Sequence, residues 1–454
     1  MALLPLHTRG RWSNRLGFIL ATTGAAVGLG NIWKFPYMAG DNGGSAFVLV
    51  YLLCVLLIGL PLMLAEMLIG RRGQQNPVST LKTLAKEANA SPFWQLVGWG
   101  GAVTLLLTLS FYSVVAGWTV AYLFRAWGGL FNGLNAAQVG ALWQQFLNDP
   151  YQLLVWHAVF MILTLWVVTK GVQAGLEKAA RIMMPMLFVI LIILDGYSTA
   201  TPGFMQGIKF LFAPDFHKIT ATVALSAMGH AFFTLAIGAG CILVYGSYLD
   251  KNIRLGSAVL TIAGLDVLVA LLAGIAIFPL IFTYHLTPAG GPGLMFEVLP
   301  IAFAKMGGGQ FFGGLFFLLL LFAAWTSSIS MAEPLVALLT ERYNFSRLAA
   351  SLIVGACAWT VGIGSVLSFN VWQNVKIFGR WNFFFANTDL VTNILLPLGG
   401  LAFAIFAGWI MSKSATRDEL KFAKEWFYQT WRFLTRYLAP ISILVIICCS
   451  ALLL

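Results

Sequence analysis

The chain has 454 residues, of which 59% are hydrophobic and only 9% are charged. A soluble globular protein carries about 25% charged residues, so this composition excludes a water-soluble fold. The formal net charge of +11 is compatible with nucleic-acid binding. However, the basic residues are scattered over short segments between apolar runs, and we expect no nucleic-acid partner.

Apolar runs long enough to cross a bilayer, about 20 residues each, recur along the whole chain. Lipid offers backbone groups no hydrogen-bond partner, so these runs are predicted to be helices, and the predicted fold class is an all-α membrane protein. Hydropathy and the breaks at proline, glycine and charged residues predict about eleven spans: 14–36, 43–70, 95–125, 151–169, 173–197, 220–249, 254–285, 309–340, 347–368, 387–412 and 431–454. The lipid bilayer is therefore an expected partner.

The N-terminal segment is short and basic, but the apolar run after it has no small-residue cleavage pattern. We interpret this run as the first span rather than as a signal peptide. The five cysteines lie inside apolar runs without a CxxC pair, which favours core packing over a disulfide or a metal site.

The basic residues predict the orientation of the chain. With the N-terminus in the cytoplasm, the loops and ends on the inner side hold 20 of the 27 lysines and arginines. Membrane proteins concentrate these residues in cytoplasmic loops. We therefore expect a multi-pass protein of a bacterial inner membrane with a cytoplasmic N-terminus.

Glycines interrupt two spans in the middle. Residues 24–31 of the first span read GAAVGLGN, and residues 233–240 of the sixth read FTLAIGAG. Broken helices at corresponding positions of two five-helix halves are typical of inverted-repeat transporters, whose binding site lies at the breaks. Close packing of helices through small residues is the alternative, and two breaks five spans apart weaken it.

Unwinding a helix at membrane depth frees backbone groups for binding. Free carbonyls can replace the hydration shell of a sodium ion, and half-helix N-termini present N–H groups to a carboxylate. Asn31 and Thr234 lie beside the two breaks and add side-chain oxygens, the ligands that a hard cation requires. These features predict a joint site for a cation and an anionic solute.

Four acidic residues lie within or at the edges of spans, where an ionised carboxylate is costly unless it has a partner: Glu66, Asp266, Glu333 and Asp389. We favour an ion-site role for Asp266 over helix packing, and both roles remain open for Glu66 and Glu333. The hydroxyls of 326–328 (TSS) either bond back to the preceding turn or form a second ion site.

Several short motifs are distributed along the chain: 14–17 (NRLG), 28–36 (GLGNIWKFP), 42–44 (NGG), 61–66, 70–71, 229–235 (GHAFFTL) and 326–329 (TSSI). With these motifs the chain resembles the neurotransmitter:sodium symporter family, in its short bacterial branch, over essentially its whole length. The resemblance implies the bacterial leucine-transporter fold in a single transporter domain, 1–454. It consists of a 5+5 inverted repeat (14–197 and 220–412) with unwound first and sixth helices, plus one extra C-terminal helix (413–454).

The same resemblance implies two sodium sites and no organic cofactor. The first, completed by the carboxylate of the substrate, uses Ala26, Asn31, Thr234 and Asp266. An acid at position 266 also implies chloride independence, because it supplies the negative charge that chloride gives the animal relatives. The second sodium site uses Gly24, Val27, Ala323, Thr326 and Ser327.

A free amino acid is the substrate that the resemblance implies. Its carboxylate would bind amides near Gly28 and Gly30 and the hydroxyl of Tyr112. The other predicted pocket residues are Leu29, Thr108, Phe233, Thr234, Ala236, Ala239, Ser327 and Met331. Ala236 and Ala239 are small where the leucine-selective relative has serine and phenylalanine, and removing a ring leaves about 100 Å3 more room. Unless other side chains fill this space, we expect a large hydrophobic or aromatic L-amino acid.

Two gates also follow from the resemblance. Lys34 and Asp389 form the outer pair above a lid of Tyr112 and Phe233, and lysine in place of arginine loses the bidentate geometry. The inner gate consists of Arg9, Trp12, Tyr248 and Glu341.

Two further positions are singled out by the resemblance. His230 stands where glutamine is common and is either a neutral hydrogen-bonding group or a proton-sensitive element. Gly175 and Pro185 match a Gly-x9-Pro pattern that predicts unwinding of the fifth span.

The predicted function is sodium-coupled symport of the amino acid into the cell by alternating access. The alternative is a non-transporting amino-acid receptor on the same fold. A channel would need a ring of filter groups around a symmetric pore, and nothing in the sequence repeats in that way. An enzyme would need a motif such as HExxH or GxSxG, and the sequence contains neither motif. We expect a monomer or a weak oligomer. The exact amino acid, the sodium stoichiometry and proton counter-transport remain open.

Overall fold

The computed structural model describes residues 10–287, 291, 293–377 and 381–453. Helices build this part of the chain, apart from an isolated bridge between Ile377 and Trp381. Nine helices among the described residues are long and apolar enough to cross a membrane. They are α3 (Ser45–Cys54) joined to α4 (Leu60–Gly73), α6 (Gln95–Trp127), α8 (Pro150–Val168), α9 (Lys178–Thr199), α13 (Leu255–Thr283), α15 (Gly309–Tyr343), α16 (Arg347–Leu367), α17 (Phe383–Asp389) joined to α18 (Leu396–Ile405), and α20 (Glu425–Phe433) joined to α21 (Ala439–Leu453).

The first and sixth spans are each made of two helices. The first consists of α1 (Arg15–Ala26) and, after a π-helical turn over Gly30–Lys34, α2 (Phe35–Asp41), and its halves are bent by 49°. The sixth consists of α11 (Ala221–Thr234) and α12 (Cys241–Ser247). The breaks predicted from glycine are therefore confirmed. The first span reaches Asp41 rather than residue 36, and the last begins at Glu425 rather than 431.

Short helices occupy segments that the hydropathy reading leaves as loops. They are α5 (Pro77–Glu87), α7 (Ala136–Leu147), α10 (Phe204–Phe212), α14 (Leu299–Lys305) and α19 (Lys413–Leu420). Side-chain caps mark the starts of α5, α7 and α19. In α5 the Oδ1 of Asn76 accepts the Ser79 N–H, and in α19 the hydroxyl of Ser412 accepts the Ala415 N–H. Such caps satisfy amides that the first turn leaves without partners.

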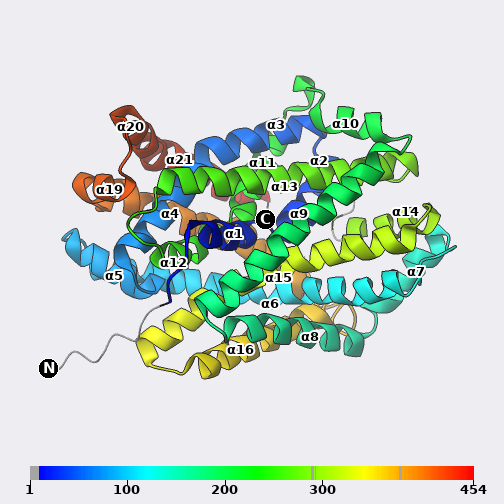
Figure 1. The fold of residues 1–454 in the computed structure, drawn as a ribbon, viewed down its shortest axis with the longest axis horizontal. Coiled ribbons are helices and arrows are strands. Elements are labelled where there is room, and N and C mark those ends of the chain that lie inside the picture. The colour runs from blue at the N-terminus through cyan, green and yellow to red at the C-terminus, as the bar shows by residue number, and fades with distance from the viewer. Residues whose placement is uncertain (1–9, 288–290, 292, 378–380, 454) are drawn as a thin grey trace.

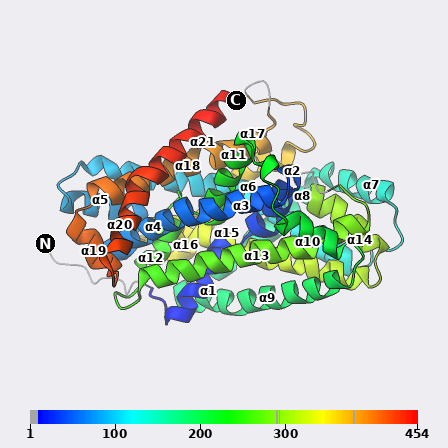
Figure 2. The same cartoon turned by 90° about the horizontal axis from the view of Figure 1, so that it is seen from above.

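The bundle is organised around α6 and α15, which pack along each other through its centre (Figure 1). Helix α1 lies against α9, α13 and α15, whereas α12 packs on α4 and α11 on α3. Figure 2 shows the spans running roughly side by side along the long axis of the molecule. The two broken spans are thus held inside the bundle by continuous helices.

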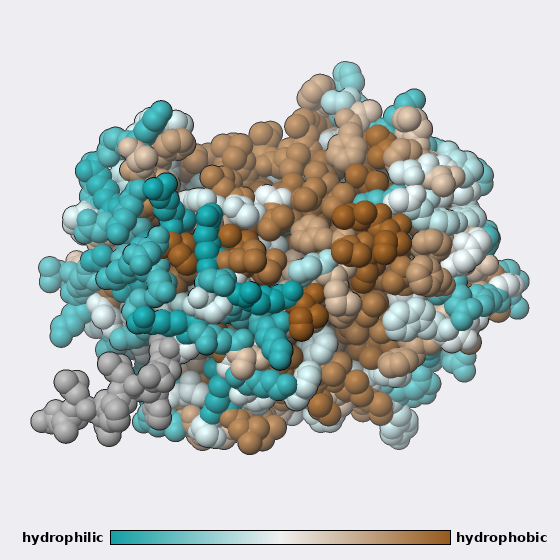
Figure 3. Space-filling model, in the orientation of Figure 1, coloured by the Kyte–Doolittle hydropathy of each residue, from teal (hydrophilic) through white to brown (hydrophobic). Residues whose placement is uncertain are grey.

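The surface separates into polar ends and an apolar middle. Figure 3 shows hydrophilic side chains gathered at the two ends of the long axis, most densely around α5, α19 and α20, and a hydrophobic band between them. A band of this kind matches the hydrocarbon layer of a membrane.

The fifth span differs from its prediction. The segment that contains Gly175 forms a π-helical turn over Val172–Glu177, and the helix then continues through Pro185 to Thr199. The unwinding predicted from the Gly-x9-Pro pattern is therefore wrong for this conformation. A π-helical turn accommodates the local irregularity without breaking the helix.

Candidate functional site

The break between α11 and α12 is fixed by left-handed backbone conformations and by a buried acid. Ala236, Gly238 and Gly240 have φ angles of 53°, 96° and 86°. Residues other than glycine rarely adopt such positive φ angles. A Cβ on Gly238 would lie 2.1 Å from the carbonyl oxygen of Leu396. The Oε1 atom of Glu66, on α4, accepts the freed N–H of Gly238 at 2.5 Å. Glu66 thus stabilises the unwound segment.

The break in the first span is fixed by Asn31. Its Oδ1 atom accepts the N–H of Gly28 at 3.0 Å, so a side chain replaces the missing helical partner. A Cβ on Gly28 would lie 2.4 Å from the Ser327 hydroxyl oxygen and 2.9 Å from that of Tyr112. The backbone at Gly28 therefore approaches two hydroxyls that no larger residue would allow.

Polar side chains from three spans converge on Asp266, in the middle of α13. Its carboxylate accepts the Asn31 amide N–H at 2.7 Å, the Thr234 hydroxyl at 3.1 Å and the Tyr51 hydroxyl at 3.5 Å. All of these side chains are buried. The structure therefore brings together three residues of the predicted first sodium site, and Tyr51 is an addition that the sequence prediction missed. Ala26, the fourth member, is buried and lines the cavity beside this cluster.

A second cluster of oxygens forms where α1 ends against α15. The Ser327 hydroxyl oxygen lies 3.1 Å from the carbonyl oxygen of Val27, 3.3 Å from that of Gly24 and 3.5 Å from that of Ala25. One hydroxyl proton cannot satisfy three carbonyls, which suits a cation beside them. Thr326 lies against Gly24, since a Cβ there would meet its Cβ at 3.0 Å.

The hydroxyls of Thr326 and Ser328 bond back to the preceding helical turn, which is one of the two interpretations of this segment. Thr326 donates to the carbonyl oxygens of Phe322 or Ala323, at 3.0 and 3.2 Å, and Ser328 donates to that of Trp325 at 2.9 Å. These are bonds to the preceding turn. All five residues assigned to the second predicted sodium site nevertheless lie together.

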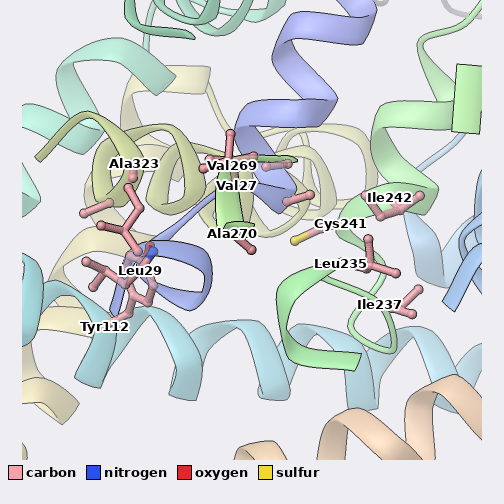
Figure 4. Packing of buried hydrophobic residues seen from close by; sticks show 14 of the residues in the cluster. Val27, Leu29, Tyr112, Leu235, Ile237, Cys241, Ile242, Val269, Ala270 and Ala323 are labelled. Carbon is pink, nitrogen blue, oxygen red and sulfur yellow. The ribbon is translucent and has the colours of Figure 1, made fainter. Parts of the chain in front are cut away.

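A buried cavity lies between the two breaks and α6. Its wall contains nine of the eleven predicted pocket residues: Gly28, Gly30, Thr108, Tyr112, Phe233, Ala236, Ala239, Ser327 and Met331. The space not filled by atoms is about 470 Å3, and part of it is continuous with solvent. Figure 4 shows Leu29 and Tyr112 on one side of this region and Leu235 and Cys241 on the other.

Leu29 and Thr234 contribute differently from their prediction, because neither lines the cavity. Leu29 is buried in the core, and its N–H is donated to the Tyr112 hydroxyl oxygen at 3.2 Å. Thr234 faces Asp266. The sequence prediction missed Ala25, Leu105, Cys241 and Leu396, which complete the wall.

At the outer end of the cavity, the ammonium group of Lys34 lies 4.3 Å from the centre of the Phe233 ring. Asp389, on α17, attracts this ammonium group electrostatically and accepts a hydrogen bond from the Asn393 amide. The residues of the predicted outer gate therefore lie in one region, with Tyr112 and Phe233 in the cavity wall below.

At the other end, Trp12 docks on α12. Its indole N–H donates to the Tyr245 carbonyl oxygen at 3.0 Å, and its ring contacts those of Tyr245 and Tyr248 at centroid distances of 5.2 and 6.1 Å. The Tyr248 hydroxyl donates to Glu333 at 2.7 Å, and Arg347 forms an ion pair with the same carboxylate. Glu333 is therefore part of this network.

The places of Glu341 and Arg9 in the predicted inner gate stay predictions. Glu341 accepts hydrogen bonds from the backbone and side-chain N–H groups of Asn76, at 2.6 and 3.1 Å. Arg9 lies outside the described residues. Arg347, which is not among the predicted gate residues, donates to the same Glu333 carboxylate as the Tyr248 hydroxyl.

His230 does not take the hydrogen-bonding role predicted for it. It is fully buried among the rings of Phe35, Phe47 and Tyr51 at centroid distances of 5.9, 5.9 and 5.2 Å. Within the described part of the chain, neither ring nitrogen has a hydrogen-bond partner. The aromatic enclosure, rather than polar contacts, holds this side chain.

Comparisons with known proteins agree with one another. A sequence model described as "Sodium:neurotransmitter symporter family" matches residues 9–145 and 143–454. The uncharacterized sodium-dependent transporter YhdH of Bacillus subtilis is 40% identical over 439 residues, which is 96% of each chain. A sodium-dependent transporter of Haemophilus influenzae is 33% identical over 447 residues, covering 96% of this chain and 97% of the relative.

More distant and structural relatives point the same way. The sodium-dependent serotonin transporter of Drosophila melanogaster is 28% identical over 384 residues, covering 74% of this chain and 60% of the relative. The crystal structure of MhsT in complex with L-phenylalanine matches with a TM-score of 0.90 and 42% identity. This match covers 98% of this chain and 100% of MhsT.

Proposed function

Because this chain belongs to the sodium:neurotransmitter symporter family, a family of sodium-dependent transporters and not of enzymes, we propose that it carries a large hydrophobic or aromatic L-amino acid across the membrane by chloride-independent sodium symport. The observation that carries this proposal is the meeting of two broken helices at one buried cavity. Carboxylate, hydroxyl and carbonyl oxygens lie on both sides of that cavity.

In this proposal the amino-acid carboxylate binds at the break of the first span. The support is the backbone of Gly28 and Gly30 in the cavity wall, together with the Tyr112 hydroxyl, which already accepts the N–H of Leu29. Amides at a half-helix terminus favour an anion through their dipoles. The carboxylate then lies next to Ala26 and the Asp266 cluster, where it can complete the coordination of a sodium ion.

Two oxygen clusters support two sodium sites. The first offers the Asp266 carboxylate with the Thr234 hydroxyl oxygen, and in our proposal the Asn31 side-chain oxygen, which accepts the Gly28 N–H in this structure, turns to the ion. The second offers the carbonyls of Gly24 and Val27 beside Ser327. Both consist of hard oxygen donors, which suit an alkali cation. The fixed charge of Asp266 lets the first site bind sodium without chloride.

The side chain of the substrate would extend toward Ala236 and Ala239. The cavity wall around them is mainly apolar, with Leu105, Met331 and Leu396. The small alanines leave space that an aromatic or long aliphatic side chain can fill. The phenylalanine bound to MhsT, a protein 42% identical to this chain, supports the same class of substrate.

Coupling in this mechanism depends on both ligands favouring a closed outer gate. A ligand shifts a conformational equilibrium only through its different affinities for the two states. Sodium and the amino acid draw the first and sixth spans together near Lys34 and Phe233. Release on the other side then requires Trp12 and the Tyr248–Glu333–Arg347 network to separate.

A non-transporting receptor on the same fold would bind the amino acid without moving it. Counterflow in proteoliposomes separates the two functions. Liposomes loaded with unlabelled L-phenylalanine and sodium should accumulate labelled L-phenylalanine transiently if the chain is a transporter. Sodium-dependent binding without any counterflow would instead establish the receptor.

A further inference from the structure

The last span carries two arginines at the edge of its apolar part. From residue 438 to the end of the chain there is no charged residue, a length of about 25 Å as a helix, close to the hydrocarbon thickness of a bilayer. Arg432 and Arg436 come immediately before this stretch and are one helical turn apart, so they lie on the same side of the helix. They therefore stand at the depth of the lipid headgroups.

The preceding span marks the same boundary. Trp409 is one residue from the end of its helix, at Ile410, and the polar Ser412 and the basic Lys413 follow. The Trp409 indole N–H donates to the carbonyl oxygen of Arg436 at 3.1 Å. Because tryptophan and tyrosine gather at the membrane interface, this contact places Arg436 at the level of the headgroups by an independent criterion.

The guanidinium of Arg436 is held by aromatic rings. Its central carbon lies 3.8 Å from the centroid of the Trp409 ring and 5.7 Å from that of Tyr437. Its Nε atom is buried without a hydrogen-bond partner in the described part of the protein. The group is thus oriented by stacking on aromatic rings rather than by an ion pair with a described residue.

Other arginines at this end of the molecule have carboxylate partners. Arg71 pairs with Glu419, Arg72 with Glu87 and Arg417 with Glu425. Among the described residues, Arg432 and Arg436 form no such ion pair. Arg432 instead donates to the Tyr428 hydroxyl oxygen at 3.1 Å. Two cations without an anionic partner among the described residues therefore lie one helical turn apart at the boundary.

An apolar stripe leads from these arginines along the same helix. Tyr437, Ile441 and Leu444 are all exposed and are spaced by four and three residues, which places them on one face. A cationic pair above an apolar stripe has the dimensions of a phospholipid, with a phosphate at the arginines and an acyl chain along the stripe.

We propose that Arg432 and Arg436, with Trp409 and Tyr437, form a binding site for the headgroup phosphate of an anionic phospholipid. Two adjacent cations favour a lipid with net negative charge over a zwitterionic one, whose own cation they repel. The site is separate from the cavity between the broken spans and does not depend on the transport function.

Native mass spectrometry of the full chain with equal amounts of dioleoylphosphatidylglycerol and dioleoylphosphatidylcholine tests the site. The wild-type protein should retain one phosphatidylglycerol preferentially. The double variant Arg432→Gln/Arg436→Gln should lose this preference by about tenfold or more, since each cation near an anionic lipid surface contributes about a fewfold in affinity. The matched control Lys421→Gln/Lys424→Gln removes two exposed charges from the loop between α19 and α20 and should retain the preference.

Equal retention of the two lipids by the wild-type protein would overturn the proposal. An equal loss of preference in the control would do the same, because it would show a general charge effect. If the wild-type protein is a dimer and the double variant is a monomer with unchanged lipid retention, the face is instead an interface with a second copy of the chain, and the proposal is overturned.

If the double variant does not fold, Arg436→Lys replaces it. This variant keeps the charge but loses the planar stack, and it should lower lipid retention to an intermediate level; unchanged retention would count against the site. Sodium-dependent binding of L-phenylalanine should persist in every folded variant, which separates this proposal from the transport function.

Discussion

Replacing Asp266 by asparagine changes the charge of the first oxygen cluster without changing its shape. The aspartate carboxylate accepts hydrogen bonds from Asn31 at 2.7 Å and from Thr234 at 3.1 Å. An asparagine retains one acceptor oxygen but presents an NH2 group to the second donor. The variant therefore loses a negative charge and gains a conflict between two donors.

The size of the effect follows from the electrostatics of a buried site. At about 4 Å and an effective dielectric constant of about 20, two unit charges interact by about 4 kcal/mol. The amide oxygen of asparagine can still coordinate the ion, and part of the lost attraction is regained from solvent reorganisation. We therefore expect sodium binding to weaken by about 1.5–3 kcal/mol, which is roughly 10- to 100-fold in the sodium concentration for half-maximal effect.

The assay is a sodium titration of labelled L-phenylalanine binding to purified protein, in chloride and in gluconate. The half-maximal sodium concentration should rise for Asp266→Asn, and chloride should lower it again because an anion can replace the missing charge. Asp195→Asn is the matched control: it removes a membrane acid on α9, and neither oxygen of Asp195 has a hydrogen-bond partner among the described residues. A midpoint for Asp266→Asn within twofold of the wild-type value would refute the reasoning.

Three further substitutions test the cavity and the inner network. Ala239→Phe fills the apolar end of the cavity and should weaken L-phenylalanine binding at least tenfold more than L-alanine binding in a competition assay; equal weakening would contradict the pocket assignment. Gly28→Ala places a methyl group 2.4 Å from the Ser327 hydroxyl oxygen and should abolish measurable substrate binding while the thermal melting of the protein is retained; binding within threefold of wild type would be inconsistent with the site. Tyr248→Phe removes the 2.7 Å hydrogen bond to Glu333, which is worth about 1 kcal/mol, and should increase hydrogen exchange around Trp12 about fivefold; unchanged exchange would exclude a gating role for this bond.

The spans and the two breaks could be predicted because composition alone dictates them. Glycines 238 and 240 sit at positive φ angles, so their presence in an apolar run signals the break directly. Short helices such as α7 and α19 could not be recognised by hydropathy, since they are too short and too mixed in polarity. Pro185 misled the prediction because a helix can continue through proline when neighbouring turns adjust.

The site was predictable where the residues belong to the broken segments and less so elsewhere. Leu105 lies three residues before Thr108 and seven before Tyr112, so helical periodicity places it on the same face of α6 as these two pocket residues. Leu396 gives no such signal, because its place in the wall depends on the close packing of α18 against Gly238. The Glu333–Arg347 pair joins two helices across a turn, and only the three-dimensional arrangement reveals it.

The central claim is that main-chain groups of two broken helices hold a cation next to the carboxylate of the substrate. Equilibrium binding of L-phenylalanine and of phenethylamine, which lacks the carboxylate, across a range of sodium concentrations tests this claim directly. If the carboxylate is a ligand of the ion, the affinity for L-phenylalanine should rise with the sodium concentration. The affinity for sodium should rise with L-phenylalanine by the same factor. Phenethylamine should bind weakly, and its affinity should not depend on sodium. The same sodium dependence for both compounds, or none for L-phenylalanine, would contradict the claim.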